Sequence, residues 1–177
     1  MKAHYILILL LLAFYNGMGQ AAGRIKDVQG QSVSLDSVTN KKILIVVLPA
    51  KPDTAMIGQL QRFQDRHVLQ VKIVGVVSAG TAGKSGGGAS YDRLATAGVI
   101  LTEGMAVGDS ANSPKLSVLK YISNRSRNRQ VDRLAEGSKY FLSESGRLYA
   151  QLGGNISLDS RVADYILQTN VPGEAHH

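Results

Sequence analysis

The spacing of apolar and polar positions at the start of the folded part of the chain predicts a β-hairpin. Two short alternating segments, RIKDV at residues 24–28 and SVSL at residues 32–35, lie on either side of Gly30. Glycine adopts the backbone angles of tight turns easily, so this pattern is typical of two strands joined by a turn. Residues 36–40 are expected to form a connecting turn.

Two uninterrupted aliphatic runs predict the central strands of a sheet. The runs ILIVVL, residues 43–48, and VKIVGVV, residues 71–77, lack the polar alternation of a half-exposed strand, which favours burial on both faces. Between them, apolar side chains recur at helical spacing, at Met56, Ile57, Leu60 and Phe63. Asp53 or Thr54 is suited to cap that helix. This strand–helix–strand unit predicts parallel pairing.

The second half of the chain predicts two helices, a β-hairpin and a final helix. In order, these are a helix at residues 91–97 followed by a short strand at 99–101, a helix capped by Ser113 with Pro114 at its first position, strands 138–142 and 147–152, and a helix beginning at Asp159 or Ser160. On the last helix, Val162, Ile166 and Leu167 are expected on the buried side. The glycine-rich segment from Ser78 to Ser90 is expected to be an exposed loop. Together these elements predict an α/β fold with a central mixed β-sheet flanked by helices.

Residues 1–19 have the pattern of a secretory signal peptide. Lys2 gives a positive start, residues 5–15 form an apolar run, and the small residues Gly17 and Gly19 follow. The run is shorter than the roughly 20 apolar residues of a membrane span. The pattern therefore predicts export, to a periplasm or to the outside of the cell.

Cleavage is expected after Gly19, with cleavage after Ala22 or retention as an N-terminal anchor as the alternatives. Residues 20–170 would then form the domain and residues 171–177 a C-terminal tail. No cysteine is available near the cleavage point to carry a lipid. We expect no stable membrane span once the signal segment is removed.

The amino-acid composition excludes some kinds of chemistry but says little about the fold. With 177 residues, 44% of them hydrophobic, the chain is long enough for one domain with its own core. It contains no cysteine, which excludes disulfide bonds and thiol chemistry. The net charge of +7 becomes +6 after cleavage, because Lys2 is the only charged side chain in residues 1–19. A basic exported protein is attracted to anionic envelope surfaces, although the same charge also serves solubility.

Three stretches make the chain resemble the glutathione peroxidase and redoxin family. They are VQGQSVSLDSVTNKKILIVVLPAKPD, AMIGQLQRFQDRHVLQVKIVGVV and GSKYFLSESGRLYAQLGG. They are similar to the family's opening pattern with its lysine-marked buried strand, to its first helix and second strand, and to its lysine–aromatic–leucine strand and hairpin. The resemblance covers nearly the whole domain and implies a thioredoxin-like fold, with the hairpin of residues 24–35 at its N-terminal end.

The positions that match the family's catalytic residues carry none of the family's catalytic groups. Counting from Ile43, the peroxidatic cysteine would fall at Lys51, the glutamine near Gly80, and the tryptophan–asparagine pair near Ala135 and Glu136. A lysine ammonium group cannot be oxidised and reduced as a thiolate can.

The features that mark the wider thioredoxin family are missing too. Pro49, Ala50, Lys51 and Pro52 stand where thioredoxins have C-x-x-C, and Gly137 and Ser138 where they have a cis-proline. The resemblance therefore implies the scaffold without its thiol activity.

Loops at strand ends are where α/β sheets place ligands, and this predicts a candidate cleft. Its residues are Pro49, Ala50, Lys51, Pro52, Asp53 and Ser78, together with the rest of the glycine-rich loop and the segment before Ser138. Lys51 beside a helix N-terminus would be an amine nucleophile or an anion ligand, or else an ordinary exposed lysine.

Other motifs have simpler explanations. The loop SAGTAGKS, residues 78–85, mimics a phosphate-binding loop and GKSGG mimics a nucleophile elbow, but the glycines that follow are poor helix formers. His67 is expected at a helix C-terminus, with no second residue at metal-ligand spacing. The basic segment of residues 123–137 lacks the aromatic residues usual in nucleic-acid binding and is expected to be a solvated loop.

The sequence thus predicts an exported, non-catalytic pseudo-peroxidase that acts by binding. No cofactor, metal ion or nucleic acid is expected, and the expected partner is an envelope protein or an anionic ligand. Two alternatives stay open: a peroxidase-type oxidoreductase in antioxidant defence that uses a group other than cysteine, and an envelope interaction protein that uses its basic loop.

Overall fold

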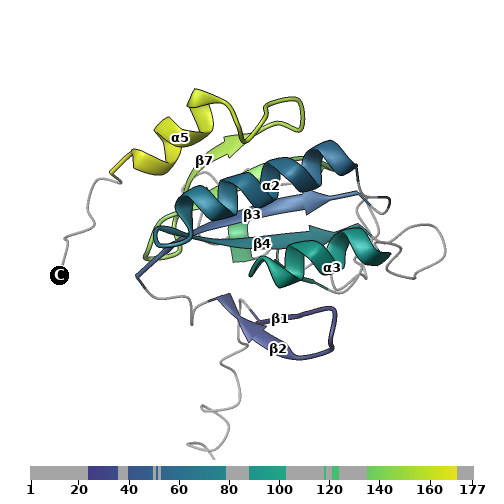
Figure 1. Ribbon diagram of the computed structural model, residues 1–177. Helices are drawn as coiled ribbons and strands as arrows, with labels where there is room; N and C mark the ends of the chain where they lie inside the picture. Colours follow the sequence, from purple (N-terminus) through teal and green to yellow (C-terminus); the bar gives the residue numbers. More distant parts are fainter. Residues whose placement is uncertain are drawn as a thin grey trace, which may run out of the picture.

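The computed structural model describes residues 24–35, 40–49, 51, 53–78, 88–102, 118, 121–123 and 135–170. The elements run in the order β1 (Arg24–Lys26), β2 (Ser32–Ser34), β3 (Lys42–Leu48), α2 (Thr54–His67), β4 (Val71–Val77), α3 (Gly88–Thr96), β5 (Ile100–Leu101), β6 (Lys139–Leu142), β7 (Leu148–Leu152) and α5 (Arg161–Gln168) (Figure 1). The expected signal segment and the C-terminal tail lie outside the described residues.

A mixed five-stranded sheet forms the centre, with strand order β5-β4-β3-β6-β7. β3 pairs in parallel with β4, and β4 with β5, whereas β6 is antiparallel to both β3 and β7. β1 and β2 form a separate antiparallel pair. This hairpin meets the β5 edge, where the backbone N–H of Val28 donates to the carbonyl of Leu101 at 3.0 Å. The parallel start and antiparallel finish predicted from the sequence are confirmed.

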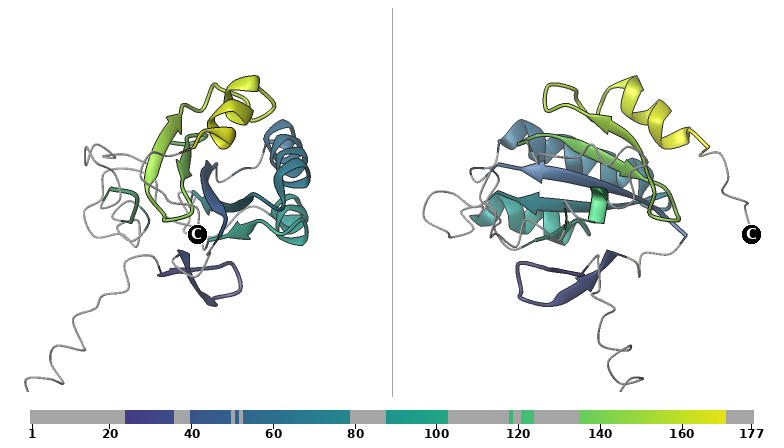
Figure 2. Two further views of the ribbon diagram at one scale, coloured as in Figure 1. Left: turned by 90° about the vertical axis from the view of Figure 1, so that its left-hand side faces the viewer. Right: turned by 180° about the vertical axis from the view of Figure 1, so that it is seen from behind.

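The aliphatic run of β3 has its side chains in two separate cores. Leu44, Val46 and Leu48 belong to the core under α2, α3 and α5. Ile43, Ile45 and Val47 belong to the core on the other face, together with Tyr121, Ile122 and Ile25 of β1. The helical residues 121–123 lie on the face of the sheet opposite α2 and α3 (Figure 2). Side chains in a strand alternate between faces, so only a run without polar positions can supply both cores.

The two helices α2 and α5 begin at caps that the sequence marks. The carboxylate of Asp53 accepts a hydrogen bond from the N–H of Ala55 at 2.9 Å, and the hydroxyl of Ser160 accepts one from the N–H of Ala163 at 3.4 Å. α2 ends at His67, as predicted. No helix within the described ranges is long and apolar enough to cross a membrane.

The structure corrects two expectations about the helices. Val162 is half-exposed, whereas Ala163 and Leu167 form the buried side of α5, because the small Ala163 rather than Val162 lies in line with Leu167 one turn later. α3 begins at Gly88, so the glycine-rich loop ends before Ser90. The expected cap at Ser113 lies outside the described residues.

Candidate functional site

Three segments of the predicted cleft meet at one end of the sheet. The backbone N–H of Ser78 donates to the carbonyl of Leu48 at 2.8 Å, which joins the ends of β3 and β4. On the other side of β3, the N–H of Gly137 donates to the carbonyl of Val47 at 2.7 Å, and the N–H of Val47 donates to the carbonyl of Ser138 at 2.9 Å. The end of β3 is therefore held between the end of β4 and the segment that leads into β6.

Lys51 and Asp53 lie just beyond β3 and are both exposed. Asp53 is the cap of α2, so its carboxylate occupies the helix N-terminus. In thiol enzymes, the free backbone N–H groups at a helix N-terminus stabilise a reactive thiolate. Here the carboxylate of Asp53 lies at the helix N-terminus instead. Ala50, Pro52 and Gly80, the other predicted residues nearby, lie outside the described residues.

Ala135 and Glu136, which the sequence resemblance predicts at the tryptophan–asparagine positions, are exposed at the entry to β6. Glu136 lies close enough to Tyr91 of α3 for its charge to act on the phenol. Burial first, and the negative charge of Glu136 second, raise the pKa of Tyr91 from 10.0 to about 12. The Tyr91 hydroxyl donates to the carbonyl of Pro49. Tyr91 thus connects α3 to the cleft.

Gly137 and Gly154 pack backbone against backbone beside the cleft. Gly137 has φ +80°, and a Cβ added to it would lie 2.9 Å from the Cα of Gly154. Within the described residues there is no cis peptide bond. Gly137 and Ser138, which the sequence resemblance predicts at the cis-proline position of thioredoxins, are therefore joined without a cis peptide bond.

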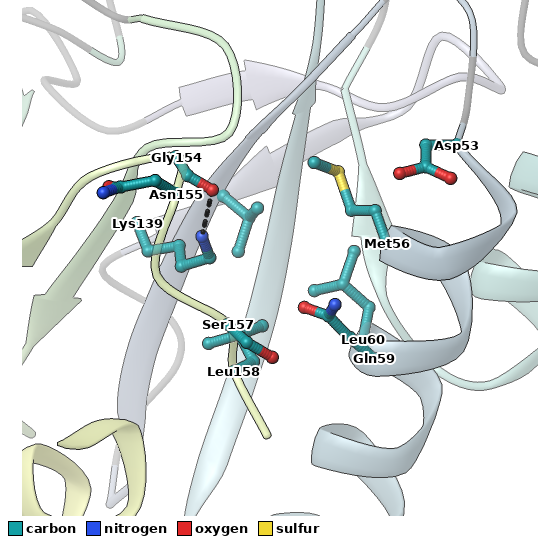
Figure 3. Close-up of a pocket in the computed structure, with 10 residues that line it drawn as sticks. Asp53, Met56, Gln59, Leu60, Lys139, Gly154, Asn155, Ser157 and Leu158 are labelled. Atoms are coloured by element: carbon teal, nitrogen blue, oxygen red, sulfur yellow. Dashed lines mark hydrogen bonds between the residues drawn. The ribbon is translucent and has the colours of Figure 1, made fainter. Parts of the chain in front are cut away.

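A small pocket lies next to the cleft, between the first turns of α2 and the segment that follows β7. Its volume is about 140 Å³, and Figure 3 shows the side chains around it. The residues that line it are Val46, Asp53, Met56, Gln59, Leu60, Lys139, Gly154, Asn155, Ser157 and Leu158. Asp53 belongs to both the cleft and the pocket.

Sequence reasoning missed Tyr91 and Lys139 as site residues. Tyr91 was expected only as the start of a helix, and its reach to Pro49 depends on how α3 packs. Lys139 carried a usable signal, since it is a charged residue in an otherwise apolar strand, KYFL. A buried lysine needs polar partners, so this position pointed to a specific environment.

His67 has a structural role. Its Nε2 lies 3.1 Å from Oδ1 of Asp164, and its ring packs on Phe63 with centroids 4.6 Å apart. Across the described part of the chain, no three His, Asp or Glu side chains converge as metal ligands would. The contact instead ties the end of α2 to α5.

No family model matches the sequence, and no curated protein matches it. Solved structures do match. Two are glutathione peroxidases: Trgpx in its apo form (TM-score 0.57, 13% identity, 81% of this chain and 90% of that one) and T. cruzi GPX1 (TM-score 0.55, 8% identity, 81% and 91%). A third is yeast Sco1 with copper bound (TM-score 0.53, 15% identity, 86% and 94%).

The fold is thioredoxin-like. At these identities the likeness concerns the fold alone, and it extends over most of each chain. The thioredoxin-like scaffold brings Pro49, Ser78 and Glu136 to one end of the sheet, where sequence reasoning expected a cleft. That these residues form a functional site stays a prediction.

Proposed function

We propose that this protein is an exported, non-catalytic thioredoxin-fold protein that acts by binding at the cleft formed by Pro49, Lys51, Asp53, Ser78 and Glu136. The observation that carries the proposal is the absence of cysteine from the whole sequence. Peroxide reduction on a thiol-peroxidase scaffold requires a thiolate, and no side chain of this chain supplies one.

The helix N-terminus beside the cleft supports the same conclusion. The capping carboxylate of Asp53 accepts from the N–H of Ala55 and brings a negative charge to the place where a reactive anion would be stabilised. A second anion there would be repelled. The cleft retains exposed charges of both signs at Lys51, Asp53 and Glu136, which suit contacts with a polar partner.

A peroxide-turnover assay tests the lack of activity. The purified protein is incubated with hydrogen peroxide or an organic hydroperoxide and a thiol donor, with a cysteine-containing thiol peroxidase as the positive control. We expect no consumption above that of the heat-inactivated protein. Turnover above that control would show that a group other than cysteine performs the reaction and would overturn the proposal.

Capture of a partner tests the binding role. The protein is immobilised and exposed to an envelope extract of its source cells, alongside the variants Lys51→Glu in the cleft and Lys26→Glu in the hairpin. Both variants make the same charge change on an exposed lysine. We expect the cleft variant to lose the captured protein and the hairpin variant to keep it. Equal capture by all three proteins would refute binding through the cleft.

The export step is tested by cell fractionation and by sequencing the N-terminus of the protein. We expect the protein outside the cytoplasm, beginning at Gln20. A protein that begins at Met1 and remains in the membrane fraction would indicate that the apolar segment is kept as an anchor.

A further inference from the structure

Two lysine side chains in the described strands of the sheet are buried, and neither has a carboxylate partner among the described residues, but their carbonyl partners differ. Lys42 is 8% exposed and Lys139 is 3% exposed. Nζ of Lys42 donates to the carbonyls of Leu167 and Thr169, at 2.6 and 2.8 Å, at the C-terminal end of α5. A helix C-terminus carries partial negative charge. The ammonium group also lies 5.4 Å from the centre of the Tyr149 ring, a cation–π contact.

Lys139 has weaker partners. Its Nζ donates to the carbonyl of Gly137 at 2.9 Å, and to those of Gly153 and Gly154 at 3.3 and 3.4 Å. In the part of the chain that the structure describes, none of the ion pairs includes Lys139. Burial lowers the pKa of this lysine, because the charged form loses hydration. A buried cation without a counter-charge is costly, and an anion placed beside it would be stabilised.

The pocket provides space for such an anion. Lys139 lines it on one side, and the apolar side chains of Met56, Leu60 and Leu158 line it as well (Figure 3). The volume of about 140 Å³ is below that of pockets for drug-sized ligands. A protein cavity of about 150 Å³ holds benzene, so this pocket is suited to a ligand of about six non-hydrogen atoms.

We propose that the pocket binds a short-chain monocarboxylate of the size of butanoate, with its carboxylate beside Nζ of Lys139 and its alkyl chain against Met56, Leu60 and Leu158. The inference deepens the proposed function and rests on it, since the pocket shares Asp53 with the cleft. Asp53 also limits the ligand: its carboxylate at the pocket would repel a second carboxylate, so a dicarboxylate of similar length is disfavoured.

Amide NMR spectra of the full protein test the ligand class. Butanoate is titrated against three matched probes: 1-butanol without the charge, butylamine with the opposite charge, and succinate with a second carboxylate. We expect saturable shifts at Gly154, Asn155 and Leu158 with butanoate, and at least tenfold weaker responses to the other three probes. Equal responses to butanoate and 1-butanol, or no saturable shift, would overturn the proposal.

Lys42 offers a matched control for the role of Lys139. Lys139→Met is expected to abolish butanoate binding, while Lys42→Met, which removes the other buried ammonium group, leaves it unchanged. If Lys139→Met does not fold, Met56→Trp replaces it, because the larger ring fills the pocket from α2. Butanoate binding that survives both Lys139→Met and Met56→Trp would refute the pocket as the site.

The outcomes separate this inference from the proposed function. Failure of butanoate to bind would leave the peroxide and capture assays as they stand and would remove only the ligand class. Peroxide turnover would overturn the non-catalytic function. It would not account for saturable amide shifts that butanoate causes and that depend on Lys139, so the ligand class would still stand.

Discussion

Gly137 lies at a position where the backbone conformation and a close neighbour both favour glycine. Its φ of +80° disfavours any side chain, and a Cβ would approach the Cα of Gly154 to 2.9 Å. Gly30 has a similar φ of +76° with nothing within 4 Å of a Cβ. A side chain at Gly30 would therefore meet backbone strain alone, whereas a side chain at Gly137 would meet both backbone strain and a steric clash.

We predict that Gly30→Ala costs about 1 kcal/mol of the free energy of unfolding, from the left-handed conformation alone. Gly137→Ala is expected to cost roughly 2–4 kcal/mol, because the clash with Gly154 adds to the same strain. Urea unfolding of both variants provides the measurement. Equal losses would mean that the Gly154 backbone moves away freely and that the packing beside the cleft is loose.

Tyr91 links α3 to the cleft. Its contribution to the free energy of unfolding is expected to depend on pH. Tyr91→Phe removes the hydrogen bond to the carbonyl of Pro49 and is expected to cost about 1 kcal/mol at neutral pH. The folded-state pKa of about 12 lies above the ordinary value of 10.0. The unfolded chain therefore loses its proton first, and the stabilisation is present below pH 10 and lost between pH 10 and pH 12.

The measurement is the free energy of unfolding of wild type and Tyr91→Phe across that range. We expect the wild type to lose stability more steeply than the variant, so that their difference shrinks as the pH rises. A constant difference up to pH 12 would show that Tyr91 titrates normally and that burial and Glu136 do not act on it.

At this scale the sequence located some site residues and missed others. Counting along β3 predicted that Lys51 and Asp53 would lie beyond the strand end, because local spacing fixes such positions. Tyr91 and Gly154 contact the site from segments far away in the chain, and no local pattern encodes the packing of α3 or the approach of two glycines. Their roles required the tertiary structure.

Among the elements, α2 begins beside the cleft with the carboxylate of Asp53 as its N-terminal cap. We predict that Asp53→Ala costs about 1 kcal/mol of the free energy of unfolding, because the N–H of Ala55 loses its acceptor. Asp53→Asn should retain most of the stability, since the amide oxygen also caps. Urea unfolding measures both variants, and an equal loss in the two would mean that charge, not capping, is what Asp53 contributes.

The elements themselves were the most predictable part of the molecule. The apolar runs of β3 and β4 and the two hairpins are local signals, and all were found. The buried face of α5 was predicted less well: Val162 was expected beside Ile166 and Leu167 on the buried side, but it is half-exposed, and the buried residues are Ala163 and Leu167. The size of a side chain is a weaker guide than its angle on the helix.

At the scale of the whole molecule, the proposed function implies a separation of the thioredoxin-like fold from thiol chemistry. The thioredoxin-like sheet and its flanking helices are complete without cysteine, because a core of aliphatic strands stabilises the fold independently of the cleft. Fold and function are specified by different residues. Restoring one catalytic atom is therefore not expected to restore an enzyme.

Lys51→Cys tests that separation directly. The new thiol would stand where the resemblance predicts the peroxidatic cysteine, but the negative charge of Asp53 opposes a thiolate there, and its carboxylate already accepts a hydrogen bond from the N–H of Ala55. We expect the thiol pKa to stay at or above its ordinary value of about 8.5 and the thiol to react with peroxide no faster than free cysteine. The pH dependence of alkylation and the rate of peroxide consumption measure these quantities.

In the double variant Lys51→Cys with Asp53→Ala, the pKa of the thiol should fall, because the helix N-terminus becomes available to the thiolate. Rapid turnover by Lys51→Cys alone would show instead that the cleft still holds a working peroxidase environment and that only its sulfur is missing.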